Sequence, residues 1–135
     1  MTPERLLVWF LRATAITLLF AAPAVLLPHA WMDTVHRELG LGGLPDSPMV
    51  GYLTRSISAL YAAIGLCFWH VASDVGRYLP LLRLTVPVTI TFSIVLVAVD
   101  FASEMPGIWT FVEAFFLVSW CVANAWLVSR QKRDG

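Results

Sequence analysis

Four apolar stretches dominate this sequence of 135 residues, and each is long enough to cross a lipid bilayer as a helix. They run over residues 6–27, 50–72, 81–101 and 107–128. The third stretch is rich in β-branched residues, but an isolated strand in lipid would leave its backbone groups unpaired, so we expect a helix there too. Only 13% of the residues are charged, about half the share usual in soluble domains. We therefore predict an all-α protein of a single domain, residues 1–135, folded as an antiparallel bundle of four transmembrane helices.

The first stretch also has features of a secretory signal, because it follows Arg5 and ends in small residues around Ala22. Its apolar run is longer than the core of a usual signal, and Arg12 interrupts it. We therefore expect a helix that is retained in the protein. In the third stretch, Thr85 or Thr89 is expected to satisfy the backbone carbonyl that Pro87 leaves free.

Positive charges are distributed unevenly around the four stretches. The amino end, the second loop and the tail carry Arg5, Arg77, Arg83, Arg130, Lys132 and Arg133, whereas the first and third loops carry only Arg37. Because Lys and Arg gather on the cytoplasmic side of membrane proteins, both termini are predicted to be cytoplasmic. The net charge is zero and no basic aromatic face appears, which argues against nucleic-acid binding.

The first external loop, residues 28–49, is the one long connection between the stretches. Its early part places Trp31, Met32, Val35 and Leu39 on one side of a helix. This spacing predicts a short amphipathic helix that lies in the membrane interface.

One cation and two carboxylates lie within the predicted spans at compatible depths. Arg55 enters the second span from outside, Asp100 closes the third on the same side, and Glu113 lies about two turns into the fourth. A charge in lipid needs a partner, so we predict an ion pair between Arg55 and Glu113, with Asp100 as a second partner or rim charge. Trp120 and Asn124 share the face of Glu113 and complete the candidate cluster.

Two interpretations of this cluster stay open. Either it lines an outward-opening site for a lipid headgroup, a quinone or another small amphipathic molecule, or it is an ion pair that only locks the second helix to the fourth. Arg12 and Arg83 lie towards the cytoplasmic side, where long side chains reach the headgroups, so we expect no ligand-binding role for them.

No catalytic group, cofactor or metal is expected. His70 lies near the inner end of the second span and His29 and His36 lie in the outer loop, so they cannot form an axial pair for haem. Cys67 and Cys121 lack the C-x-x-C spacing of redox or zinc sites and fit small packing residues instead. No catalytic triad, phosphate loop or metal-ligand spacing is present.

Three segments resemble the DoxX-like family of small four-helix bacterial membrane proteins, in particular its members of unknown function. They are residues 55–65 (RSISALYAAIG), the loop 74–83, and Met105-Pro106-Gly107 ahead of the helix with Glu113. The resemblance implies a four-helix bundle in the bacterial inner membrane, with Arg55 and Glu113 at the charged positions of the pattern. Some relatives are subunits of quinone-linked thiosulfate oxidation, but no redox site is recognisable here, so the resemblance implies no reaction.

Three functions remain as alternatives. The first is a non-catalytic membrane protein that binds a lipid or a small amphipathic ligand at the Arg55/Glu113 site. The second is an accessory subunit that packs against a larger membrane complex, or a homo-oligomer of this chain. The third is a quinone-linked redox subunit. We favour the first two, with membrane lipids as partners.

Overall fold

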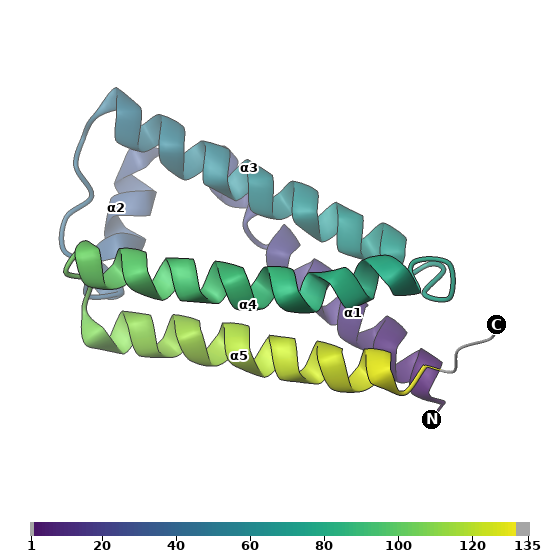
Figure 1. The fold of residues 1–135 in the computed structure, drawn as a ribbon. Coiled ribbons are helices and arrows are strands. Elements are labelled where there is room, and N and C mark those ends of the chain that lie inside the picture. Colours follow the sequence, from purple (N-terminus) through teal and green to yellow (C-terminus); the bar gives the residue numbers. More distant parts are fainter. Residues whose placement is uncertain (1, 132–135) are drawn as a thin grey trace. The chain divides into compact units, whose positions relative to one another are not determined.

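The computed structural model of the protein describes residues 2–131, and every regular element in that range is a helix (Figure 1). The elements are α1 (Pro3–Leu19), the 3-10 helix η1 (Ala22–Val25), α2 (His29–Glu38), α3 (Pro48–Val71), α4 (Leu79–Ala102) and α5 (Gly107–Ser129). Four stretches of the described residues are long and apolar enough to cross a membrane, namely Pro3–Val25, α3, α4 and α5. The prediction of an all-α chain with four apolar helices is confirmed, and these helices indicate a multi-pass membrane protein. Lys132 and Arg133, which enter the orientation argument, lie outside the described residues.

The contacts within the chain divide it into two compact units. The first consists of residues 1–8 together with residues 74–135, and the second consists of residues 9–73. The prediction of a single domain therefore stays a prediction.

In the second unit, α3 packs closely against α1. Gly65 of α3 is buried, and a Cβ atom placed on it would lie 2.9 Å from the backbone carbonyl oxygen of Ala15. Ala15 is itself fully buried. Small residues on facing sides let two helix backbones approach, which is the usual basis of helix packing in lipid. The side of α3 that carries Gly65 is therefore a helix–helix contact.

The first span is interrupted where its small residues gather. The α-helix ends at Leu19, and the short helix η1 follows from Ala22 to Val25. Pro23 explains the break, because its ring clashes with the carbonyl of the residue four positions earlier, which is Leu19, and it restricts Ala22 as well. The continuous apolar stretch thus forms two helical pieces, and η1 packs against α3.

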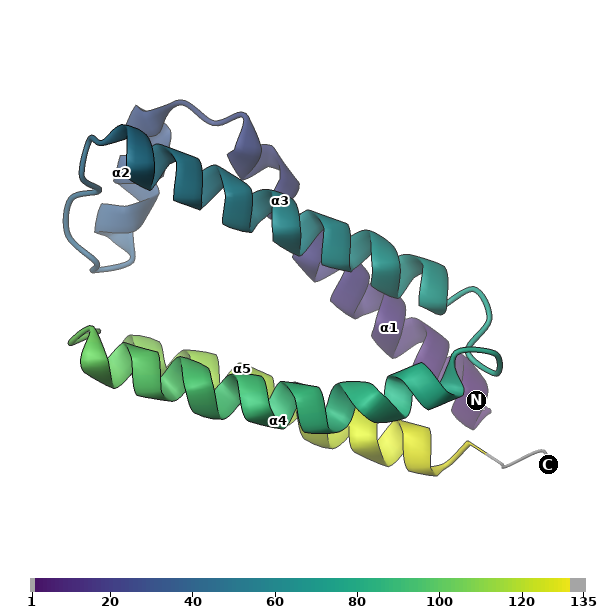
Figure 2. The same cartoon turned by 45° about the horizontal axis from the view of Figure 1, so that its top comes forward.

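In the first unit, α4 and α5 lie side by side along most of their length and form a helical hairpin (Figures 1 and 2). Leu82 of α4 and Cys121, Leu127 and Val128 of α5 are buried. Helix α4 continues through Pro87. The Thr85 hydroxyl donates to the carbonyl of Leu82 at 2.7 Å, and not to that of Arg83, the residue four positions before the proline. Of the two predicted donors to the carbonyl freed by Pro87, Thr85 is therefore wrong, and Thr89 stays a prediction.

Two arginines stack on tryptophan rings that lie near the ends of α3 and α5. The Arg12 guanidinium lies 5.5 Å from the ring centroid of Trp69, and that of Arg130 lies 4.5 Å from the ring centroid of Trp126. Cation–π contacts of this kind stabilise a cation next to an apolar surface. For Arg12 the contact is consistent with a side chain that extends towards the end of α3.

Candidate functional site

Arg55 lies on the first turns of α3, where the helix start is well defined. The hydroxyl of Ser47 accepts a hydrogen bond from the Val50 amide at 3.3 Å and caps the helix, and Pro48 fits its first position. From Arg55, Nη1 donates to the carbonyl of Gly51 at 3.3 Å and Nη2 donates to that of Leu27 at 3.2 Å. Arg55 therefore ties α3 to Leu27, in the short connection between η1 and α2.

Gly51 makes room for this conformation of the arginine. A Cβ atom at position 51 would lie only 3.0 Å from Nη1 of Arg55. The guanidinium folds back over the helix at a place where no side chain stands in its way.

Within residues 9–73, Arg55 has carbonyl partners and no carboxylate. The three acidic residues of this unit are Asp33, Glu38 and Asp46, and the ion pair among them is that of Asp33 with Arg37. A guanidinium carries five N–H donors in a planar fork that matches carboxylate and phosphate groups. Arg55 is half-buried, and its two carbonyl contacts leave donors for an anionic group.

Asp100 and Glu113 come together in the α4/α5 hairpin. Asp100 lies near the end of α4 and is only 6% exposed, whereas Glu113 on α5 is half-buried. Their side chains are neighbours across the hairpin. Within the described part of the chain, Oδ2 of Asp100 is buried and has no hydrogen-bond partner.

The predicted ion pair joins Arg55 of one unit to Glu113 of the other, and it stays a prediction. Each residue has neighbours within its own unit, which are carbonyl groups for Arg55 and the Asp100 carboxyl for Glu113. Sequence reasoning placed Asp100 and Glu113 in one cluster with Arg55, and the structure brings these two carboxyl groups together within the hairpin.

Asn124 belongs to a separate contact within the hairpin. It is fully buried, and its amide nitrogen donates to the Thr85 hydroxyl at 2.9 Å and to the Leu82 carbonyl at 3.4 Å. Asn124 is eleven positions from Glu113, which is about 16 Å along a helix. It therefore cannot share a compact site with Glu113, although both lie on the side of α5 that meets α4. Trp120, between them, is half-buried.

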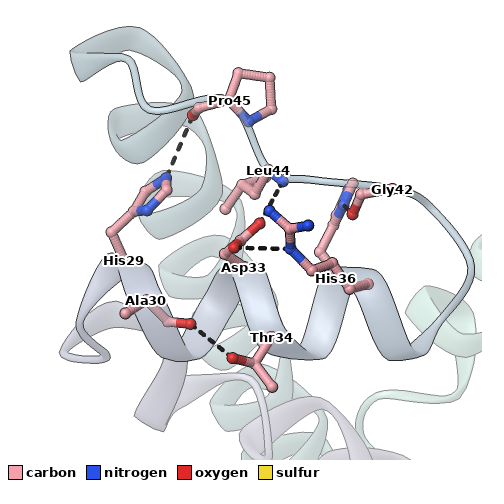
Figure 3. Close-up of polar contacts among 9 residues, drawn as sticks. His29, Ala30, Asp33, Thr34, His36, Gly42, Leu44 and Pro45 are labelled. Carbon is pink, nitrogen blue, oxygen red and sulfur yellow. Dashed lines mark hydrogen bonds and ion pairs between the residues drawn. The ribbon is translucent and has the colours of Figure 1, made fainter.

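The polar side of α2 was not predicted as a site, yet it carries several polar contacts to the loop that follows it (Figure 3). Asp33 accepts from Nε of Arg37 at 3.0 Å and from the Leu44 amide at 2.7 Å. The Leu44 amide and the Arg37 side chain hold the pKa of the Asp33 carboxyl below its ordinary value of 3.8. The four-residue spacing of Asp33 and Arg37 is the signal that would have identified this pair.

Among the described residues, no group of three His, Cys, Asp or Glu side chains is close enough to hold a metal ion. Cys67 is exposed and Cys121 is buried, and both are free thiols. Arg55 and the Asp100–Glu113 pair offer charge and hydrogen-bonding groups within the predicted spans.

The predicted resemblance to the DoxX-like family stays a prediction. Comparisons with protein-family models, with curated proteins and with solved structures found no match.

Proposed function

We propose that this chain is a small, non-catalytic integral membrane protein that binds a lipid or another small amphipathic molecule through Arg55. The observation that carries the proposal is the setting of the Arg55 guanidinium, which is half-buried and has only carbonyl partners within its unit. A cation placed within a span is costly unless it faces a partner of opposite charge. An anionic headgroup supplies that charge, and the fork of the arginine binds phosphate or carboxylate with two parallel hydrogen bonds.

The apolar part of such a ligand would lie along α3. Tyr52, Leu53 and Ile57 flank Arg55 on this helix and are exposed. A molecule with an anionic head and an apolar tail can satisfy Arg55 and cover these side chains at the same time, which neither a free anion nor a hydrocarbon does.

The proposal places the four spans as an antiparallel bundle in a bacterial inner membrane, with both termini in the cytoplasm. The cluster of Arg5, Arg77, Arg83 and Arg130 at the amino end, the second loop and the tail supports this orientation. Arg55 then lies in the outer half of the membrane, and α2 lies in the outer interface.

An accessory role is the second candidate, and exposed apolar side chains on the hairpin favour it. Ile94, Phe111, Phe116 and Val122 are all more than half exposed. In a multi-pass protein such side chains face lipid or a neighbouring subunit. A partner protein, or further copies of this chain, would cover them.

Native mass spectrometry of the protein, extracted gently from its own membrane, tests the two candidates. We expect an added mass typical of a single lipid, which is retained in Arg83→Ala and lost in Arg55→Ala. Arg55→Lys keeps the charge but not the planar fork, so it should bind the ligand more weakly. A protein partner at fixed stoichiometry would instead support the accessory role. A bare chain, or an added mass that survives Arg55→Ala, would contradict the ligand proposal.

A further inference from the structure

Helix α2 has a polar face and an apolar face on opposite sides. The polar face contacts the loop that follows the helix, whereas the apolar face is exposed. His29, Asp33, His36 and Arg37 follow the three- and four-residue spacing of one face. Trp31, Val35 and Leu39 follow the same spacing on the other side.

The polar face is occupied by the chain's own loop (Figure 3). The His29 ring nitrogen Nε2 lies 3.3 Å from the Pro45 carbonyl, and Nδ1 of His36 lies 2.9 Å from the Gly42 carbonyl. Asp33 accepts from the Leu44 amide and from Arg37. The loop that follows α2 therefore folds back over the polar face and is held there at several points.

The opposite face is open. Trp31 is 66% exposed, and Val35 and Leu39 are each 55% exposed, whereas Met32 beside them is buried. Because the loop occupies the other side of the helix, this apolar face is the one that α2 offers to its surroundings.

The position of α2 in the chain indicates what covers this face. The 3-10 helix η1 ends the first span at Val25, α2 begins at His29, and α3 begins the next span at Pro48. An element joined by so few residues to the end of one span, and by a nine-residue loop to the next, stays at the membrane surface. We propose that Trp31, Val35 and Leu39 insert into the lipid of the outer interface, with the loop 40–47 as a solvent-side cover. This inference rests on the proposed placement of the spans in the membrane.

The charges of this element determine how it binds lipid. Residues 29–47 contain the carboxylates of Asp33, Glu38 and Asp46 against the single guanidinium of Arg37, so their net charge is −2 with neutral histidines. Interfacial helices that bind by charge carry Lys and Arg on the polar face and favour anionic lipids. Here the attraction comes from apolar burial alone, so a more anionic membrane should not draw α2 deeper.

The test uses the full-length chain with Cys67→Ala and Cys121→Ser, reconstituted in phosphatidylcholine vesicles. A nitroxide is attached at Val35→Cys, and its collisions with oxygen and with a water-soluble nickel chelate are measured by electron paramagnetic resonance. Leu60→Cys, an exposed position in the middle of α3, is the lipid reference, and Asp46→Cys in the loop is the water reference. We expect the ratio of oxygen collisions to nickel collisions to be at least several-fold higher for the nitroxide at position 35 than for the nitroxide at position 46.

The inference is overturned if the nitroxide at Val35 is as accessible to nickel as the one at Asp46. It is also overturned if the nitroxide at Val35 is shielded from both oxygen and nickel, because that result would indicate a protein partner. If the nitroxide at Leu60 is also open to nickel, the proposed membrane placement fails together with the inference. Addition of phosphatidylglycerol should leave the depth of position 35 unchanged or reduce it. A deeper position would contradict the role assigned to apolar burial.

Discussion

The amide nitrogen of Asn124 donates to the hydroxyl of Thr85 at 2.9 Å, across the contact between α5 and α4. Thr85 in turn donates to the Leu82 carbonyl, and the Cys121 thiol, one turn before Asn124, donates to the Val86 carbonyl at 3.8 Å. On α4 these contacts involve residues 82–86, directly before Pro87, where the helix lacks one backbone donor. The hairpin is thus joined by polar groups at the point where its first helix is weakest.

Replacement of Asn124 by leucine should weaken this hairpin. Interhelical hydrogen bonds within membranes contribute about 0.6 kcal/mol on average and up to about 1.7 kcal/mol, and we expect a loss in this range. Denaturant titration in mixed micelles measures it, with Ser119→Ala on the exposed side of α5 as the control. If both variants unfold at the same denaturant concentration, the Asn124 contact contributes no stability.

Gly65→Ala should separate α1 from α3. The added Cβ would lie 2.9 Å from the carbonyl oxygen of Ala15, and backbone cannot move aside as a flexible side chain does. Overpacking of this kind costs about 1–3 kcal/mol. The control is Gly107→Ala, since a Cβ there meets nothing within 4 Å. Thermal unfolding in detergent should show a lower midpoint for Gly65→Ala only. Equal midpoints would mean that the two helices separate without cost.

Arg55→Ala tests the predicted ion pair as well as the contacts within the unit. Loss of hydrogen bonds from a charged donor costs about 1.5–3 kcal/mol, whereas removal of one member of a buried ion pair costs about 3–5 kcal/mol. A double-mutant cycle with Glu113→Gln separates the two cases, because a direct pair gives a coupling energy between the substitutions. Additive losses would show that Arg55 and Glu113 do not interact, and no loss for Arg55→Ala would contradict both roles.

The attachment of the loop to α2 should depend on pH through Asp33. Since the pKa of its carboxyl is lowered by the Leu44 amide and the Arg37 side chain, ionised Asp33 stabilises the folded loop fully above its ordinary pKa of 3.8. This contribution is lost as the pH falls through the lower pKa of the folded protein. A nitroxide at Asp46→Cys should therefore become more mobile in strong acid. With Asp33→Asn added, its mobility should no longer change over this pH range, and an unchanged acid response would assign the effect to another group.

The orientation can be tested by cysteine labelling in intact cells, with Cys67→Ala and Cys121→Ser. The outer label is placed at Asp46→Cys. The neighbouring Ser47 is left unchanged, because its hydroxyl caps α3 and its replacement would disturb the helix start. We expect an impermeant maleimide to label Asp46→Cys from outside and to label Ser129→Cys only after the cells are opened. The reverse pattern would invert the proposed topology.

The long helices were predictable because the length and hydropathy of each apolar stretch determine them. The bounds of α3 and α5, for example, differ from the predicted ones by at most two residues. The end of α1 at Leu19 depends on a local clash with Pro23, which hydropathy does not register. The short helix α2 was predicted from the spacing of Trp31 and Val35.

The contacts of the site were harder to predict, because a charge within a span indicates that a partner is needed but not which group supplies it. For Arg55 the contacts within its unit are the carbonyls of Gly51 and Leu27, and a backbone acceptor leaves no mark in the sequence. Depth placed Asp100 and Glu113 in one cluster with Arg55; the two carboxyl groups meet within the hairpin, and their pairing with Arg55 stays a prediction. Depth alone does not reveal which side of a helix meets which neighbour.

The burial of Asp100 near the end of α4 also bears on how the chain enters the membrane. During synthesis α4 emerges from the ribosome before α5. At that stage the side-chain carboxyl of Asp100 is not yet covered by α5, the helix that carries Glu113. Only residues 103–106 separate the two helices, so the second follows the first almost at once. A lone α4 would have to bring an uncovered acidic group to the lipid boundary, which is costly. The hairpin, and not the single helix, is therefore the natural unit of membrane insertion.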